Sequence, residues 1–229
     1  MAQAFAQMNA VVPNLEKMPN YQLAAHLYKA AYGNSPRKEL ISVEKLPKIS
    51  FAGFEDAYRK MFGNMYGATV IFAGNVDPAE ISTSHVYNEL KPMVEKYIGS
   101  LPASKKGAHK INPANYAYPV SGKVEDIFGF EMTTPKTSCA LMYTGASKAG
   151  LKERLLMSAM TDILDIIYVD TIREEEGGTY GVGTSGQVTA KPEPMAELQI
   201  QFDTDPERAE KLIDMTITGF ESLAKNGPT

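Results

Sequence analysis

The sequence predicts an α+β fold, a two-layer sandwich in which helices cover one face of a largely antiparallel mixed sheet. Residues 196–203 alternate between apolar and polar side chains, a pattern typical of an antiparallel strand with one face in water. Residues 150–173 have apolar side chains at helical spacing. From residue 119 onward the expected elements follow the order ββαββα, which favours a layer of helices packed on an antiparallel sheet.

The N-terminal part is expected to be mainly helical. Helical patterns lie at residues 21–32, at residues 54–62 and from Pro78 to about Ile98. The last of these contains Pro92, which is expected to kink or divide the helix. Residues 68–75 (ATVIFAGN) are apolar and partly β-branched, so a buried strand is expected there.

The C-terminal part supplies most of the sheet. Strands are expected at residues 122–132, 136–144, 180–189 and 196–203, and Asp205-Pro206 caps the last helix. The residues expected to face the core are Leu156, Met160, Ile163, Leu164 and Ile167 in the helix at 150–173, and Ala196, Leu198, Ile200 and Phe202 in the last strand. Those expected to face water are Ser158, Asp162 and Asp165 in the helix, and Glu197, Gln199, Gln201 and Asp203 in the strand.

Length and composition allow one large domain or two small ones. The chain has 229 residues, of which 44% are hydrophobic, enough to bury a sizeable core. We expect residues 1–102 to form a helical segment followed by a strand and a helix, and residues 103–118 to form a linker rich in turn-forming residues. Residues 119–229 then form the ββαββα unit, either separately or folded together with the first part.

Charge, hydropathy and cysteine content argue against several classes of protein. The net charge of −4 and the lack of a basic stripe give no support for nucleic-acid binding. No apolar run reaches the length of a transmembrane helix, so no membrane partner is expected. A single cysteine, Cys139, excludes an intramolecular disulfide, and its place in an expected strand favours a buried thiol.

The sequence lacks the usual motifs for metal binding and nucleophilic catalysis. The three histidines, His26, His85 and His109, form neither an H-x-x-E-H nor an H-E-x-x-H motif, and there is no C-x-x-C pair. A zinc site built from this chain alone is therefore not expected. There is no G-x-S-x-G motif, and GVGTSG does not open a helix as a dinucleotide-binding loop would.

The segment TIREEEGGTYGVGTSG, residues 171–186, permits two interpretations. In the first, the double glycine ends the helix and the three glutamates are solvated. In the second, Arg173 and Tyr180 are hydrogen-bond donors that converge on one point, as a developing oxyanion requires. Acids at the negative end of a helix dipole are unfavourable, and such local conflicts tend to gather at functional sites. The pattern by itself leaves both interpretations open.

Two segments resemble the insulinase–pitrilysin family of zinc peptidases, the inverzincins. IREEEGGTYGV is similar to the family's signature of an arginine followed seven residues later by a tyrosine, and Arg173 and Tyr180 have this spacing. YRKMFGNMYGATVIFAGNVDP and LKPMVEKYIGSLP are similar to a second family segment. The resemblance extends from about residue 35 to the C-terminus. The family's H-x-x-E-H motif and its distant glutamate are absent, so the chain resembles the C-terminal, non-metal half.

The resemblance implies the non-catalytic C-terminal portion of a zinc metallopeptidase, which forms half of a chamber that encloses peptides. Arg173 and Tyr180 are expected to bind the peptide substrate. Zinc is expected only in the N-terminal catalytic half or partner subunit, and none in this chain. The chain is thus expected to be a section of a longer protein or a separate partner subunit, and to be inactive alone. Bacterial relatives favour a periplasmic or cell-envelope location.

Two alternative functions and one further partner remain open. A proteolytically inactive scaffold or assembly subunit of the same superfamily would keep the fold without the chemistry, although the Arg173–Tyr180 pair argues against it. An isolated ferredoxin-like domain would need a small-molecule pocket, which no motif identifies. The strand at 68–75 could complete the sheet of the second repeat, or it could pair with a second copy, which predicts a homodimer by strand swapping.

Overall fold

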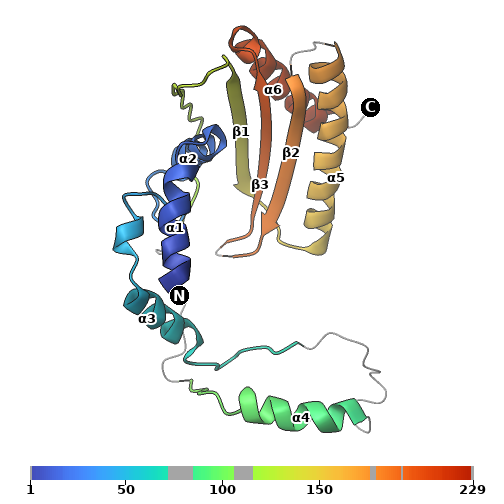
Figure 1. Cartoon of the computed structure of the whole chain (residues 1–229). Coiled ribbons are helices and arrows are strands. Elements are labelled where there is room, and N and C mark those ends of the chain that lie inside the picture. Colours follow the sequence, from blue (N-terminus) through green and yellow to red (C-terminus); the bar gives the residue numbers. More distant parts are fainter. Residues whose placement is uncertain (1, 72–84, 106–115, 176–178, 192, 228–229) are drawn as a thin grey trace. The chain divides into compact units, whose positions relative to one another are not determined.

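The computed structural model describes residues 2–71, 85–105, 116–175, 179–191 and 193–227, without the side chains of residues 2, 85–90, 173–175 and 179–180 (Figure 1). The chain forms two compact units. One unit comprises Met1–Phe5 and Glu44–Asn112, and the other comprises Ala6–Val43 and Pro113–Thr229.

The first unit is helical over much of its described length. It contains η1 (Leu46–Lys48), α3 (Phe51–Phe62) and α4 (His85–Tyr97). α3 confirms the helix predicted at 54–62, and the Ser50 Oγ at its start accepts a hydrogen bond from the Gly53 N–H at 3.0 Å. α4 continues through Pro92, so the helix is not divided there, and the alternative expectation of a kink stays a prediction. Because Pro92 is exposed, water can satisfy the carbonyl group that loses its partner.

The strand predicted at 68–75 is not formed in its described part. Residues 68–71 belong to neither a helix nor a strand, and residues 72–75 lie outside the described residues. Just before this segment, the Met65 N–H donates to the Pro102 carbonyl at 2.7 Å. The pairing of a strand at 68–75, and with it the homodimer by strand swapping, stays a prediction.

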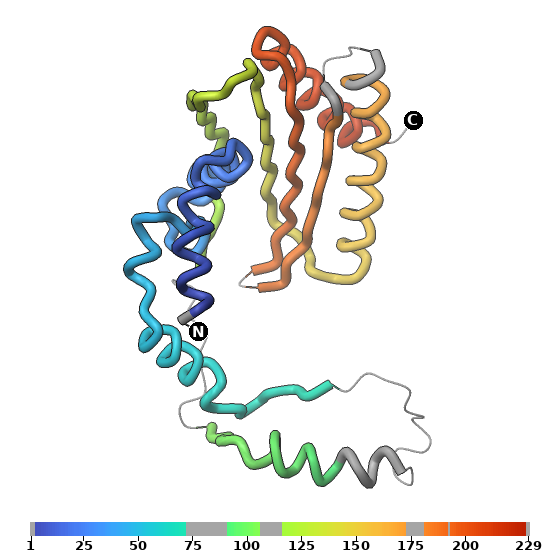
Figure 2. The backbone as a smooth tube through the Cα atoms, viewed as in Figure 1, coloured from blue at the N-terminus to red at the C-terminus, as the bar shows by residue number. Residues whose placement is uncertain are grey.

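The second unit contains the sheet. Its elements are most of α1 (Ala2–Leu15), α2 (Pro19–Tyr32), β1 (Thr137–Ala146), α5 (Leu151–Tyr168), η3 (Val169–Glu175), β2 (Thr179–Thr189), β3 (Met195–Thr204), η4 (Pro206–Arg208) and α6 (Ala209–Asn226). Among the described residues the strands are antiparallel, and β3 lies between β1 and β2 (Figure 2). α2 confirms the helix predicted at 21–32. Helices packed on an antiparallel sheet confirm the predicted fold class.

The core lies between the sheet and the helices α5 and α6. Its buried residues are Cys139, Leu164, Tyr168, Ile172, Val182, Leu198, Ile200, Phe202 and Leu212. Tyr168 fixes the contact between the two helices, because its hydroxyl donates to the Thr216 carbonyl at 2.8 Å. Its ring lies 3.0 Å from the place where a Cβ on Gly219 would sit. A larger residue at 219 would therefore push α5 and α6 apart.

The helix predicted at 150–173 is α5 continued by η3, and its buried face is shifted from the prediction. Leu156 is 58% exposed, whereas Met157 is 8% exposed. Gly186 of β2 makes this possible, because a Cβ there would lie 2.3 Å from the Met157 Sδ. Successive helix positions point about 100° apart, so a glycine in the facing strand decides which of the two neighbours is buried.

Three predicted strands, those at 136–144, 180–189 and 196–203, are confirmed as β1, β2 and β3. The strand predicted at 122–132 is wrong, because these residues form no strand. They follow α2 instead: the Val120 N–H donates to the Ala31 carbonyl at 2.8 Å, and the ring of Phe128 stacks on that of His26 with centres 3.7 Å apart. A strand-like sequence needs a neighbouring strand to become part of a sheet, and here its neighbour is a helix.

The other face of the sheet is partly covered by α2, which the alternation in β3 did not predict. The Tyr32 hydroxyl donates to the Glu197 carboxylate, and the Gln187 Nε2 donates to the same carboxylate at 3.0 Å. Glu197, expected to face water, is therefore only 9% exposed. Burial, and then the hydrogen bond to Glu197, raises the pKa of Tyr32, so its hydroxyl keeps its proton.

Candidate functional site

The candidate site lies where the chain passes from α5 to β2. Arg173 belongs to η3, the helical turn that continues α5, and Tyr180 is the second residue of β2. Residues 176–178 lie outside the described residues, as do the side chains of Arg173 and Tyr180. The predicted convergence of these two side chains therefore stays a prediction, and their backbone setting is what the structure adds.

Arg173 lies in a π-helix. η3 spans Val169–Glu175 and follows α5 without a break. Next to Arg173, Ile172 is fully buried in the core, and the Thr171 Oγ1 donates to the Ile167 carbonyl at 2.7 Å. π-Helical turns are rare and occur frequently at functional sites. The backbone at Arg173 is thus irregular and yet firmly anchored.

Tyr180 lies in a β-bulge. Thr179 pairs with Thr204 and Val182 pairs with Phe202, so two residues of β2 face a single residue of β3. Bulges interrupt the regular alternation of side chains and are common next to active sites, where they re-aim a side chain. Val182, buried in the core, holds the strand just after the bulge. A second irregular and anchored backbone segment therefore follows the loop.

A tether joins the helix that leads to Arg173 and the strand that carries Tyr180. The Asp165 Oδ1 accepts a hydrogen bond from the Thr184 N–H at 2.8 Å. The Thr184 hydroxyl lies 2.8 Å from the same oxygen and 2.9 Å from the Thr161 carbonyl, so its proton is shared. Asp165 was predicted to face water. The sequence feature that could have indicated its contact with β2 is its position next to Leu164, at the margin of the helix's apolar face.

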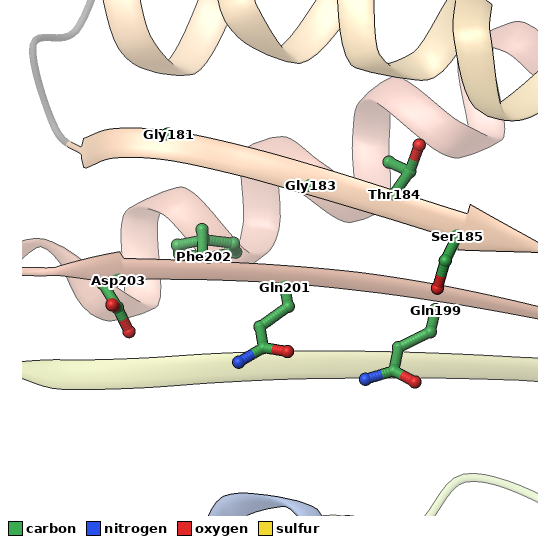
Figure 3. Close-up of a pocket in the computed structure, with 8 residues that line it drawn as sticks. All are labelled: Gly181, Gly183, Thr184, Ser185, Gln199, Gln201, Phe202 and Asp203. Atoms are coloured by element: carbon green, nitrogen blue, oxygen red, sulfur yellow. The ribbon is translucent and has the colours of Figure 1, made fainter. Parts of the chain in front are cut away.

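An open pocket of about 400 Å³ lies on the sheet face opposite α5 and begins at the bulge. Its lining residues are Gly181, Gly183, Thr184, Ser185, Gln199, Gln201, Phe202 and Asp203. Gln199, Gln201 and Asp203 project from β3 to the same side, whereas Thr184 projects toward the helices (Figure 3). The Asp203 carboxylate accepts hydrogen bonds from the Lys136 Nζ and the Ser138 Oγ, each at 2.6 Å.

The described side chains do not fit a zinc ion. No three His, Cys, Asp or Glu side chains come together among them in a way that could hold a metal. The His26 Nδ1 lies 2.8 Å from the Asp126 carboxylate, which provides only two ligands. His109 and the side chain of His85 lie outside the described residues.

Cys139 has the character of a core residue, as predicted. It is 6% exposed, and burial, followed by the charge of Asp203, raises its pKa to about 11. The thiolate needed for nucleophilic attack is thus scarce at neutral pH. Within the described part of the chain, no helix combines the length and apolar character needed to cross a bilayer.

Comparison with known proteins places these features in a family. The family model described as the peptidase M16 inactive domain matches residues 48–229. A zinc protease PQQL-like protein from Arabidopsis thaliana is 22% identical over 226 residues, an alignment that covers 93% of this chain and 23% of that protein. The chain thus spans about a quarter of the length of this curated relative.

Solved structures share the fold. The periplasmic protease PqqL from Escherichia coli superposes with a TM-score of 0.71 at 18% identity, over 98% of this chain and 23% of that one. The ferredoxin protease FusC, solved with Arabidopsis ferredoxin, gives a TM-score of 0.71 at 17% identity over the same shares. A peptidase M16 inactive domain from Pseudomonas fluorescens gives 0.67 at 19% identity, over 100% of this chain and 52% of that one.

The family match covers most of the chain, including β1 to β3, α5 and α6. It agrees with the resemblance of IREEEGGTYGV and VIFAGNVDP to the non-metal half of the inverzincins. The chain belongs to the peptidase M16 inactive domain family, the non-catalytic C-terminal part of the insulinase–pitrilysin peptidases.

Proposed function

We propose that this chain forms the non-metal half of a peptide-enclosing chamber in a zinc metallopeptidase, where Arg173 and Tyr180 bind the substrate at the bond to be cleaved. One observation carries the proposal: the π-helix at Arg173 and the β-bulge at Tyr180 stand on the two sides of the same loop. π-Helical turns occur frequently at functional sites, and β-bulges are over-represented next to active sites. A helix that simply ended at a double glycine would need neither.

Both side chains supply hydrogen-bond donors to a carbonyl that becomes an oxyanion. The guanidinium of Arg173 has five N–H donors in a fixed plane, and the phenol of Tyr180 has one O–H donor. Donors that are already in place stabilise the developing charge without reorganisation during the reaction. The buried neighbours Ile172 and Val182, which are 0% and 9% exposed, support such preorganisation of the backbone on both sides.

Zinc belongs to the other half in this proposal. The described side chains of this chain do not fit the metal. In this proposal the role of the chain is therefore limited to substrate binding. The chain alone is therefore inactive, and its partner is an N-terminal catalytic half or subunit that carries the metal-binding motif. The family description and the protease relatives support peptides as substrates.

The test is the Tyr180→Phe variant in the peptidase assembled from this chain and its zinc-bearing half. We expect kcat on a quenched fluorescent peptide to fall at least tenfold, up to the roughly 10²–10³ typical of a lost oxyanion donor, with zinc content unchanged. Tyr66→Phe, which alters an exposed tyrosine outside the site, is the matched control. An unchanged rate in Tyr180→Phe would mean that the loop only ends the helix. An assembly without zinc and without activity would favour the scaffold function.

A further inference from the structure

We propose that the pocket on the open face of the sheet is a subsite for an extended peptide, whose main chain is bound by the side-chain amides of Gln199 and Gln201. The inference rests on the proposed function only in taking a peptide as the ligand. The pocket begins at Gly181 and Asp203, where the bulge at Tyr180 lies. A chain held at Tyr180 can thus continue along the strands over Gln201 and then Gln199.

The spacing of the two glutamines matches an extended peptide. They lie two residues apart on β3 and project to the same side of the sheet (Figure 3). Same-face residues of a strand are about 6.6–6.8 Å apart, and an extended peptide presents its main-chain groups along one edge at the same interval. Each side-chain amide has N–H donors and a carbonyl acceptor, so it can pair with the N–H or the carbonyl of a peptide group. The pair can therefore bind alternate peptide groups, those along one edge of one chain.

Both amides are available for a ligand. Among the described residues, neither the Gln199 nor the Gln201 side chain has a hydrogen-bond partner, although each is half-buried. On the same face, Glu197 and Asp203 are held by Tyr32, Gln187, Lys136 and Ser138. Along this face of β3, the carboxylates at 197 and 203 thus have partners among the described residues, whereas the amides at 199 and 201 between them do not.

The walls of the pocket allow a main chain to come close. A Cβ added at Gly181 or at Gly183 would meet no atom of the described residues within 4 Å, so they leave the space above β2 open. On the other side of Gln201 the facing residue of β1 is the small Ala140. Glycine in a strand often marks a place where another backbone approaches. A flat and narrow ligand such as an extended peptide fits this trough.

Charge favours main-chain recognition over selection of charged side chains. Asp203 is the one charged residue among the described lining residues, and Lys136 lies 2.6 Å from its carboxylate. The trough therefore has little net charge with which to attract a basic or acidic side chain. The expected ligand is an uncharged, extended segment bound with little regard to sequence.

Binding to the full 229-residue chain tests this inference. The probe is a capped decapeptide of alternating Ser and Ala, added to ¹⁵N-labelled protein while the side-chain amide signals of glutamine are followed. We expect the signals of Gln199 and Gln201 to shift and Gln201→Ala to weaken binding about three- to tenfold, the effect of one hydrogen bond. Gly183→Val, which fills the trough and suits a strand, weakens binding similarly. Gln7→Ala, on the exposed face of α1, leaves binding unchanged.

A second peptide isolates the main chain. N-methylation of every residue removes the N–H donors along both edges of the extended peptide while the side chains stay the same, and we expect it to weaken binding as much as Gln201→Ala does. Binding without shifts at Gln199 and Gln201, or equally tight binding of the methylated peptide, would overturn the subsite. Either result leaves the effect of Tyr180→Phe on kcat as a separate measurement, so failure of the subsite and failure of the proposed function are distinguishable.

Discussion

Glu197 lies in the central strand and owes its burial to two neighbours. Tyr32 and Gln187 both donate to its carboxylate, which a 9% exposed charge requires. In the sequence Glu197 has the same alternating position as Gln199 and Gln201. Its partner Tyr32 lies 165 residues earlier in the chain. No local pattern could have distinguished Glu197 from the glutamines that stay open to a ligand.

Removing the hydroxyl of Tyr32 is expected to destabilise the fold. In Tyr32→Phe the buried Glu197 carboxylate loses one of its two donors, which lowers the free energy of unfolding by about 1–3 kcal/mol. Denaturant unfolding measures this change. Tyr28→Phe alters a neighbouring tyrosine on α2 and serves as the control. Equal stability of the Tyr32 and Tyr28 variants would show that the Glu197 contact does not hold α2 on the sheet.

The buried thiol of Cys139 predicts a dependence of stability on alkaline pH. Burial, and then the charge of Asp203, raises its pKa from 9.0 to about 11. Because the folded-state value is the higher one, its contribution to stability is fully present below about pH 9 and is lost as the pH rises through about 11. We expect Cys139→Ala to show a smaller fall in the free energy of unfolding over this interval than the wild type. Parallel pH profiles would contradict this assignment.

At the scale of elements, the strongest sequence patterns predicted the structure well. The alternation at 196–203 and the helical spacing at 150–173 reflect side chains packed between the two layers, so the pattern and the structure agree on the elements, although Leu156 is exposed and Glu197 is buried against the prediction. α1 was not predicted, because it has no acid in its first turn, no base in its last and a proline inside. Residues 122–132 have a strand-like pattern and were predicted as a strand. A local pattern cannot show that the segment's neighbour is the helix α2 and not another strand.

The backbone of the candidate site could be anticipated only in part. The double glycine after Glu176 and the spacing of Arg173 and Tyr180 indicated a functional loop. Ile172 in the π-helix and Val182 beside the bulge belong to the core, and this tertiary packing is not visible in a local sequence pattern. The convergence of the two side chains stays a prediction.

The tether between α5 and β2 is expected to hold this loop in place. Asp165→Ala removes the acceptor for the Thr184 N–H, so the hydrogen exchange of that amide should become faster and the fold should lose about 1–3 kcal/mol. Asp165→Asn keeps an oxygen acceptor and should retain most of the protection. Asp162→Ala, on the exposed side of the same helix, is the control. Unchanged exchange at Thr184 in Asp165→Ala would show that the strand is held by packing alone.

At the scale of the whole molecule, the second unit is built from two separate stretches of the chain. Residues 6–43 belong with residues 113–229, and the pair Tyr32–Glu197 joins them. Composition can indicate a linker such as 103–118, but it cannot show which segments return to pack against a later sheet. The division into 1–102, 103–118 and 119–229 therefore stays a proposal.

The central claim is that Arg173 and Tyr180 act together on one substrate oxygen. A double-mutant cycle of Arg173→Gln and Tyr180→Phe, measured as kcat/KM in the peptidase assembled with its zinc-bearing half, tests this most directly. Groups that act as a unit give non-additive losses. We predict that each single variant loses activity and that the double variant loses clearly less than the product of the two losses. Independent, multiplicative losses, or no loss in either single variant, would contradict the account.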